Sequence, residues 1–320
     1  MEFTVAICTY NGEKRIPEVL EYLQKQNHQQ DIKWEVIIVD NNSSDRTAEV
    51  VSQYSQIWRS DCQLRYVFEP VQGLAAARQR AIESAQSDLI GFIDDDNLPL
   101  ENWLVEAYNF GVKNPNIGAY GGIIYPMLDA PKPPYFEQIS SILAVNNPGE
   151  VAFCYAREAK PRKVPAGAGC VFRKQAWLDC VPNQLSRQGR DENKGQMSGC
   201  GEDTEVLYHI QNSHWEIWHN PQMAIYHHIE PRRLEKDYLL KLARGFGLAN
   251  YTFRLTRLYP WQRIFMPPLV LIYLISDTYK VIVYYFRYRD NFSDDIAKAC
   301  EFQGRLGRWI SSTYFFKFNN

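Results

Sequence analysis

Short apolar segments alternate with helix-like segments over the first 125 residues of the chain. The apolar segments are rich in valine, isoleucine and aromatic residues, and each is short enough to be a buried strand: residues 3–9, 34–40, 64–68 and 89–94. Between them lie segments with the apolar spacing of short helices: residues 13–26, 44–54 and 74–85. This alternation predicts a mainly parallel sheet that is covered by helices on both faces.

The pattern changes in the second half of the chain. Residues 126–164 are rich in proline and weakly periodic, which predicts an irregular excursion. Two further strands are expected over residues 164–172 and 215–226, with a helix over 202–211 between them, and from residue 234 onward the pattern is helical. We therefore expect an α/β domain over residues 1–231 and a helical, basic and aromatic region over residues 232–320.

Polar side chains follow three of the predicted strands. The first strand is followed by Tyr10-Asn11-Gly12, the second ends in Asp40-Asn41-Asn42, and the fourth leads into Asp94-Asp95-Asp96. In an open α/β sheet, ligands bind beyond the carboxyl ends of the strands. These strand ends are therefore the expected place for a functional site.

The three adjacent carboxylates of Asp94, Asp95 and Asp96 repel one another, so such a cluster usually needs a cation. Carboxylate oxygens favour Mg²⁺ or Mn²⁺, which often share their coordination with substrate phosphates. The alternative is an acidic loop that caps the next helix. A histidine at the same edge, such as His227, would complete the shell of the cation, although a structural histidine is the alternative there.

Two further groups have both a chemical and a structural interpretation. Glu202 and Asp203 open a predicted helix, where the helix dipole stabilises carboxylates, and one of them could instead be a general base. Arg78 and Arg80 lie in a small-residue helix after the third strand. The guanidinium of one of them could approach a phosphate, while an exposed helix arginine is the alternative.

The order of these motifs resembles the family 2 glycosyltransferases of the GT-A fold. The resemblance covers about residues 3–230 and rests on the segments TVAICTYNGEKRI, WEVIIVDNNSSDRT, GLAAARQRAI, IGFIDDDN, GAGCVFRK, GEDTEVLYHI and IYHHI taken in this order. It implies a Rossmann-like mixed sheet flanked by helices, followed by a C-terminal helical extension. It also implies that residues 1–231 form a nucleotide-sugar-dependent catalytic domain.

The resemblance also implies a role for each matched residue. Thr9 and Tyr10 would line the base pocket, Asp40 would hydrogen-bond the base, and Asn42 would approach the same nucleoside. Arg78 would lie near the diphosphate, Asp94 would contact the ribose, and Asp95 belongs to the same nucleotide-sugar-binding segment. Asp96 would ligate the cation and His227 would close the metal or diphosphate site. Asp203 would be the catalytic base, with Glu202 beside it facing the acceptor.

The activity that the resemblance implies is an inverting sugar transfer that depends on Mn²⁺ or Mg²⁺. The donor would be a nucleoside-diphosphate sugar, with UDP as the expected nucleotide, and the acceptor would be a hydroxyl of a glycan or a lipid-linked molecule in polysaccharide biosynthesis. One alternative is a nucleotidyltransferase of sugar-phosphate activation, which would need a Gly-rich basic loop where this chain has Thr9–Gly12. Another is a non-catalytic glycan-binding protein on the same scaffold.

The formal net charge of −2 conceals two unlike parts of the chain. Residues 1–231 contain 20 Lys and Arg against 30 Asp and Glu, or −10, whereas residues 232–289 contain 11 against 3, or +8. The mild total excludes a simple polyanion binder, so we expect no nucleic acid partner. Seven cysteines without C-x-x-C spacing, and no secretory signal, favour reduced thiols in the cytoplasm.

Residues 264–286 are the most apolar stretch and contain Asp277 and Lys280, which are spaced to pair along one helix. This stretch has three interpretations: a helix lying at a membrane interface, a spanning helix, or a helix buried against the catalytic domain or a second subunit. The basic flanks favour contact with anionic headgroups. We therefore expect a cytoplasmic enzyme that meets the inner face of the cell membrane through residues 232–290.

Overall fold

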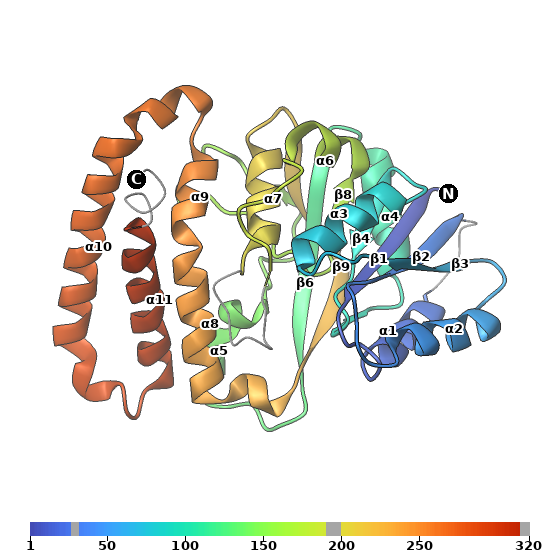
Figure 1. The fold of residues 1–320 in the computed structure, drawn as a ribbon, viewed down its shortest axis with the longest axis horizontal. Helices are drawn as coiled ribbons and strands as arrows, with labels where there is room; N and C mark the ends of the chain where they lie inside the picture. Colours follow the sequence, from blue (N-terminus) through green and yellow to red (C-terminus); the bar gives the residue numbers. More distant parts are fainter. Residues whose placement is uncertain (27–31, 190–199, 314–320) are drawn as a thin grey trace. The chain divides into compact units, whose positions relative to one another are not determined.

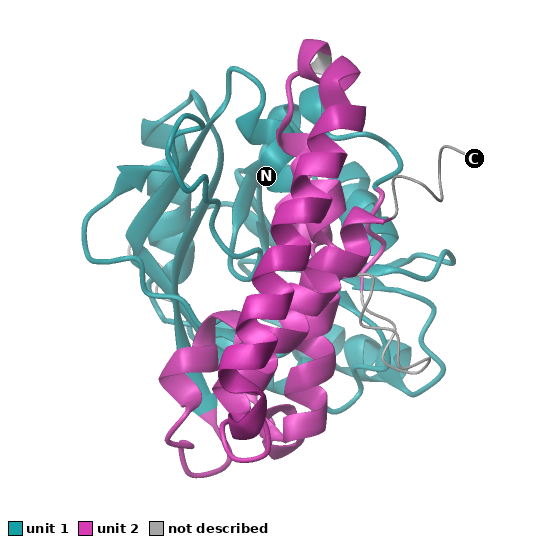
Figure 2. Cartoon of the chain, turned by 90° about the vertical axis from the view of Figure 1, so that its left-hand side faces the viewer, with its two compact units in different colours: residues 1–127, 144–185, 206–228 teal, residues 128–143, 186–205, 229–320 magenta. Residues whose placement is uncertain are grey.

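The computed structural model describes residues 1–26, 32–189 and 200–313, and its chain forms two compact units (Figure 2). Unit 1 contains residues 1–127, 144–185 and 206–228. Unit 2 contains residues 128–143, 186–205 and the chain from residue 229 onward. The expected division has a single boundary between residues 231 and 232. In the structure, segments 128–143 and 186–205 also belong to unit 2. The last seven residues of the expected C-terminal region lie outside the described part of the chain.

Unit 1 is built on a mixed sheet of nine strands among the described residues (Figure 1). The spatial order is β3-β2-β1-β4-β8-β6-β9-β5, and β7 pairs with β9. Strands β1 to β4 run parallel, whereas β8, β5 and β7 pair with their neighbours in the antiparallel direction. The strands are β1 Phe3–Thr9, β2 Trp34–Asp40, β3 Gln63–Phe68, β4 Leu89–Phe92, β5 Asn97–Pro99, β6 Ile117–Leu128, β7 Phe153–Cys154, β8 Val171–Arg173 and β9 Glu216–Ile229.

Strands β1, β2 and β4 are buried along their whole length, which explains why they are almost continuously apolar, whereas the edge strand β3 is partly exposed. Alternate side chains of β1 enter different clusters: Val5 and Ile7 enter one, and Ala6 and Cys8 enter the other. The first cluster is covered by α1 Ile16–Gln24, α2 Thr47–Ile57 and α4 Trp103–Lys113, and the second by α3 Leu74–Ser84, α6 Lys174–Cys180 and most of α7 Glu202–Gln211. The predicted α/β architecture with helices on both faces is confirmed.

The sequence pattern missed strand β6. Its glycines lower the strand propensity, but they are needed where two backbones approach closely. A Cβ atom built on Gly122 would lie 1.6 Å from the carbonyl oxygen of Met223 in β9. Strands β1 and β2 and helix α7 have the predicted bounds, whereas β4 ends at Phe92 rather than at Asp94. The pattern also missed β5 and α4.

The described part of unit 2 is helical (Figure 2, magenta). Helices α8 and α11 pack closely through glycines, since a Cβ atom on Gly307 would lie 2.4 Å from the carbonyl oxygen of Arg244. Asp295 caps α11 by accepting a hydrogen bond from the Lys298 backbone N–H at 2.9 Å. The elements are α5 Phe136–Ile139, η1 Ser140–Leu143, η2 Pro231–Leu234, α8 Lys236–Leu248, α9 Asn250–Arg257, η3 Pro260–Phe265, α10 Met266–Tyr288, η4 Arg289–Asn291 and α11 Ile296–Ser312.

The charged residues of α10 do not pair with each other as the sequence suggested. Asp277 is buried and accepts hydrogen bonds from Arg254 of α9, whereas Lys280 is exposed. The expected Asp277–Lys280 pair is therefore wrong, because Arg254 of α9 binds both oxygens of the Asp277 carboxylate. Within the described residues, 261–291 is the one stretch long and apolar enough to cross a membrane by length and composition alone, and an 18-residue window inside it has a mean hydropathy of 1.5.

Candidate active site

Thr9 at the end of β1 is tied to the middle carboxylate of the acidic cluster. Its hydroxyl donates a hydrogen bond of 2.5 Å to Oδ2 of Asp95, and Nη2 of Arg15 donates to the same oxygen at 2.8 Å. The same Arg15 nitrogen also donates to the Tyr10 carbonyl at 3.1 Å. Burial raises the pKa of Asp95, while Arg15 acts in the opposite direction. Asp95 therefore braces the loop after β1, so its environment differs from those of Asp94 and Asp96.

Asp40 ends β2 as a buried carboxylate held by two donors. Tyr66 of β3 donates its hydroxyl to Oδ2 at 2.6 Å, and the Ser43 backbone N–H donates to Oδ1 at 2.9 Å. Burial raises the pKa of Tyr66, and the hydrogen bond to Asp40 adds to the rise. A carboxylate has about four acceptor positions. Asp40 can therefore still accept a hydrogen bond from a ligand.

The neighbouring Asn41 was not singled out from the sequence, although it organises this edge. Its Nδ2 donates to the Val71 carbonyl at 2.6 Å, and its Oδ1 accepts from the Gly73 backbone N–H at 2.7 Å. Asn41 thereby fixes the loop that leads into α3. Asn42, by contrast, is exposed and has a left-handed backbone with φ of 62°. In a run of two asparagines and two serines, the sequence has no signal that distinguishes the buried member.

Arg78 of α3 is buried rather than exposed, and it faces the first carboxylate of the cluster. Its Nη2 lies 3.4 Å from Oδ1 of Asp94, and its guanidinium lies over the Phe92 ring at 5.7 Å from the ring centroid. Only 5% of Arg78 is exposed to solvent. The interpretation as an exposed helix arginine is therefore wrong.

Asp96 and His227 meet where β5 pairs with β9. Oδ2 of Asp96 lies 3.3 Å from Nε2 of His227, because the register places Asn97 opposite His227. The Asn97 amide donates to the other carboxylate oxygen at 3.0 Å. The adjacent His228 is directed elsewhere, with its Nδ1 3.2 Å from a carboxylate oxygen of Glu18.

This pair can be tested as part of a cation site. Among the described residues, no group of three or more His, Cys, Asp and Glu side chains is arranged to hold a metal ion. A carboxylate and a neighbouring imidazole nevertheless suit a Mn²⁺ or Mg²⁺ ion that takes its other ligands from phosphate and water. Asp96 and His227 therefore fit a shared cation site and do not form a complete protein cage.

Glu202 and Asp203 belong to unit 2, and they form the first turn of α7 after Gly201, whose φ is 92°. Glu202 is buried, while Asp203 is half-buried and accepts a hydrogen bond from the Thr204 backbone N–H at 2.7 Å. Both carboxylates lie where the helix dipole stabilises the charged form. Gly199, the first residue of the motif that they belong to, lies outside the described residues.

A third carboxylate in this turn, Glu205, was not recognised in the sequence. It is buried and accepts hydrogen bonds from the backbone N–H groups of Ser186, at 3.0 Å, and Arg187, at 2.9 Å. Arg187 in turn donates through Nε to the Cys200 carbonyl at 3.1 Å. Glu205 is thus a structural acid that holds the segment before α7. Its polarity alone does not separate it from Glu202 and Asp203 in the sequence.

Comparison with known proteins shows which family this chain belongs to. A model of glycosyl transferase family 2 matches residues 4–176. The glucosyl-dolichyl phosphate glucuronosyltransferase of Haloferax volcanii is 22% identical over 284 residues, which covers 86% of this chain and 85% of that protein. The poly(ribitol-phosphate) beta-N-acetylglucosaminyltransferase TarS of Staphylococcus aureus is 30% identical over 110 residues, but this match covers only 34% of this chain and 19% of TarS.

Solved structures show the same fold. The crystal structure of S. aureus TarS 1–349 in complex with UDP has a TM-score of 0.52 at 16% identity, and covers 99% of this chain and 92% of that chain. GalNAc-T7 with UDP, GalNAc and Mn²⁺ has a TM-score of 0.54 at 12% identity, over 79% of this chain and 51% of that one. With the mixed sheet and the family match over more than half of the chain, these comparisons show that the protein is a member of glycosyl transferase family 2 with a GT-A-type fold.

Proposed function

We propose that this enzyme transfers a sugar, with inversion, from a nucleoside-diphosphate donor to a hydroxyl of a glycan or lipid-linked acceptor. The observation that carries the proposal is the 3.3 Å approach of Asp96 Oδ2 to His227 Nε2 at the end of the sheet. It brings together two ligand types that suit a cation bound to a diphosphate. Arg78, buried beside Asp94, adds a positive charge of the protein itself to the same edge.

The donor nucleotide is bound at the ends of β1 and β2 in this proposal. Asp40 accepts a hydrogen bond from the base, Thr9, Tyr10 and Asn42 border the nucleoside, and the segment Asp94–Asp96 meets the ribose and the diphosphate. UDP is the proposed nucleotide. This choice is supported by the structures of S. aureus TarS 1–349, which were determined with UDP and with UDP-GlcNAc.

The leaving group determines what the charged side chains contribute. As the bond from the anomeric carbon to the diphosphate breaks, negative charge grows on the leaving oxygen, and the Arg78 guanidinium stabilises it. Asp96 and His227 would hold a Mn²⁺ or Mg²⁺ ion, which when bound supplies further charge stabilisation to the diphosphate. Asp95 does not ligate in this scheme, because Thr9 and Arg15 already occupy its Oδ2.

The acceptor is activated by Asp203, with Glu202 beside it. The Asp203 carboxylate takes the proton of the acceptor hydroxyl while that oxygen attacks the anomeric carbon from the face opposite the diphosphate. One bond forms as the other breaks, so the configuration inverts once. A retaining double displacement would need a carboxylate nucleophile, and this scheme uses none.

The location that we propose is the inner face of the cytoplasmic membrane, contacted through residues 232–290. The support is a row of exposed apolar side chains on α10 that includes Ile275, which is 70% exposed, and Phe286, which is 67% exposed. The one carboxylate in the middle of this helix, Asp277, is turned inward onto Arg254. A helix with one apolar face and a charged interior side suits an interface rather than the bilayer core.

Transfer assays with Asp203→Asn test the catalytic proposal. The variant should lose transfer while binding UDP with nearly normal affinity, because the amide keeps the shape of the side chain but cannot accept the proton. Asp290→Asn is the matched control, since the Asp290 side chain is 92% exposed in unit 2. The assay screens UDP-sugars and other nucleotide sugars with Mn²⁺ and Mg²⁺. Unchanged turnover of Asp203→Asn would refute its role as the base.

A further inference from the structure

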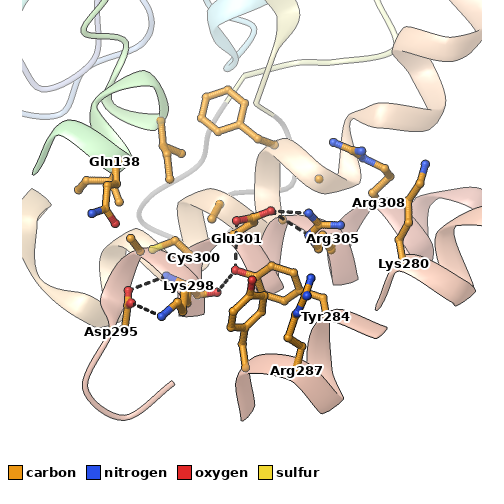
Figure 3. Close-up of a pocket in the computed structure, with 18 of the residues that line it drawn as sticks. Gln138, Lys280, Tyr284, Arg287, Asp295, Lys298, Cys300, Glu301, Arg305 and Arg308 are labelled. Carbon is orange, nitrogen blue, oxygen red and sulfur yellow. Dashed lines mark hydrogen bonds and ion pairs between the residues drawn. The ribbon is translucent and has the colours of Figure 1, made fainter. Parts of the chain in front are cut away.

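Unit 2 contains a cavity with a volume of about 1290 Å³ that none of the proposed catalytic residues line (Figure 3). Its walls come from α5 and η1, from the C-terminal half of α8, from α10 and from α11. The cavity is therefore formed by four different segments of the helical unit. Its size is sufficient for the head of a small amphiphile.

The lining of this cavity is strongly basic. Five cationic side chains border it, against two carboxylates, which leaves three more positive than negative charges. The cations are Lys280, Arg287, Lys298, Arg305 and Arg308, and the acids are Asp295 and Glu301. A concave surface lined by an excess of one charge concentrates ligands of the opposite charge.

Both carboxylates are already neutralised by partners on α11. Nζ of Lys298 lies 3.0 Å from Oδ2 of Asp295, and Nε of Arg305 lies 3.1 Å from Oε1 of Glu301. Tyr284 of α10 donates its hydroxyl to the second oxygen of Glu301 at 3.1 Å (Figure 3). The acids thus have little capacity to balance the remaining cations.

The three remaining cations are Lys280, Arg287 and Arg308. None of them forms an ion pair with a carboxylate in the part of the chain that the structure describes. Two are guanidinium groups, which bind phosphate oxygens with two parallel hydrogen bonds, and the third is an ammonium group, which binds phosphate as a point charge. All three line the same cavity, so it holds the types of group that bind phosphate.

The same cavity is continuous with the apolar surface of α10. Tyr279 and Val283 line the cavity, and they are also exposed members of the apolar face formed with Ile275, Ile282 and Phe286. A soluble phosphate ester or a nucleic acid has no hydrocarbon chains that could bury this apolar surface. A lipid places its charged head beside its hydrocarbon chains, so it matches both parts of this surface.

We infer that this cavity binds the phosphate head of an anionic membrane lipid, whose hydrocarbon chains lie along the exposed face of α10. The inference deepens the proposed membrane location and rests on it, by naming the lipid chemistry that unit 2 recognises. It is independent of the chemistry of sugar transfer. The site selects for a headgroup phosphate that is not masked by a cationic choline.

Calorimetric titration with short-chain lipids below their micelle concentration tests this site without any membrane. Dihexanoyl phosphatidic acid should bind the whole protein at least about tenfold more tightly than dihexanoyl phosphatidylcholine, and more tightly than inorganic phosphate. Equal binding of inorganic phosphate and phosphatidic acid would identify a free-anion site and overturn the lipid assignment. Equal binding of the two lipids would overturn the role of the headgroup charge.

A matched pair of triple variants locates the binding. Lys280→Gln/Arg287→Gln/Arg308→Gln should lower the affinity for phosphatidic acid at least about tenfold, because the variant removes three of the cations that line the cavity. The control Lys33→Gln/Lys113→Gln/Lys241→Gln removes the same charge from exposed positions outside the cavity and should bind as the wild type does. An equal loss in both triple variants would indicate a general charge effect and refute the site.

Two further measurements separate a loss of lipid binding from misfolding of a variant and from effects on unit 1. Arg287→Gln alone changes one exposed side chain, so it provides a milder test if the triple variant does not fold, and it should still weaken phosphatidic acid binding. UDP binding by each variant reports on unit 1. Lipid binding that persists in an enzyme without transfer activity would refute the proposed function while leaving this inference intact.

Discussion

Asp277 of α10 accepts two hydrogen bonds from the Arg254 guanidinium of α9, with Nη1 2.7 Å from Oδ2 and Nη2 3.1 Å from Oδ1. Ser312 of α11 donates to the same carboxylate at 3.0 Å. The Asp277 side chain is 1% exposed, so three helices share one buried charge pair. This pair removes the one acidic group in the middle of α10 from the apolar face of that helix.

Breaking this pair should destabilise the protein strongly. Asp277→Leu leaves the Arg254 charge buried without its partner, and we expect a loss of about 3–5 kcal/mol in the free energy of unfolding. Urea denaturation measures it, with the exposed Asp290→Leu as control. The double variant Arg254→Met/Asp277→Leu should recover most of the stability, since apolar replacement of a buried pair is often neutral. A double variant as unstable as the single one would contradict this account.

The Asp96–His227 pair predicts the metal dependence of nucleotide binding. Asp96→Ala and His227→Ala should each weaken the binding of UDP in the presence of Mn²⁺ by at least about tenfold, because each removes one ligand of a site with few protein ligands. Their affinities for UDP in EDTA should change much less. Isothermal titration calorimetry of UDP with and without Mn²⁺ separates the two effects.

Asp290→Ala serves as the matched control for both variants and should bind like the wild type. If Mn²⁺ strengthens UDP binding equally in the wild type and in Asp96→Ala, the cation is held elsewhere. If Mn²⁺ has no effect on any of the proteins, the proposed metal dependence is wrong.

Asp45 should give the protein a stability that depends on pH. Burial by itself would raise the pKa of Asp45, but hydrogen bonds from the Thr47 side chain and from the Glu13 and Thr47 backbones together lower it below its ordinary value of 3.8. A carboxyl group whose pKa is lower in the folded state than in the unfolded state stabilises the folded protein at pH values above its unfolded pKa. That contribution is lost as the pH falls through the folded value.

We therefore expect the free energy of unfolding of the wild type to exceed that of Asp45→Asn at about pH 6, and the difference to shrink toward about pH 2. Urea denaturation at several pH values measures this difference. A gap between the two proteins that stays constant with pH would show that the charge of Asp45 does not contribute.

Two glycines of α11 should respond differently to the same substitution. A Cβ atom on Gly307 would lie 2.4 Å from the Arg244 carbonyl oxygen, whereas one on Gly304 would meet only the Ala243 carbonyl at 3.6 Å. Gly307→Ala should cost about 1–3 kcal/mol because α8 and α11 must move apart. Gly304→Ala should be neutral or stabilising by up to about 1 kcal/mol, because alanine favours the helix. Thermal unfolding compares the two, and equal melting temperatures would refute the close packing.

Much of the fold of unit 1 could be predicted because the pattern of apolar residues within each short segment indicates whether it forms a strand or a helix. A strand buried on both faces must be continuously apolar, so residues 3–9 and 34–40 were recognised with their bounds. The strand β6 was missed because its glycines are explained by the backbone of β9, a partner distant in sequence. Likewise, a periodic pattern does not reveal that segments 128–143 and 186–205 belong with the C-terminal helices.

Some features of the candidate site could also be predicted from the sequence, and others could not. The types of residues at the strand ends could be read in order, and so could the family that they resemble. The different environments of three consecutive aspartates could not be read, because Asp94 faces Arg78, Asp95 faces Thr9 and Arg15, and Asp96 faces His227. Asn41 and Glu205 were missed for the same reason, since their roles depend on backbone groups from other segments.

The class of the fold, the family and the acidic strand ends could therefore be derived from the sequence, because periodicity and motif order are properties of neighbouring residues. Which charges are paired became known from the three-dimensional structure alone. Asp277 is bound to Arg254 rather than to Lys280, and Lys280 is left with Arg287 and Arg308 around a basic cavity. Burial and hydrogen bonding depend on which surfaces of distant helices meet, and the spacing within one helix does not contain that information.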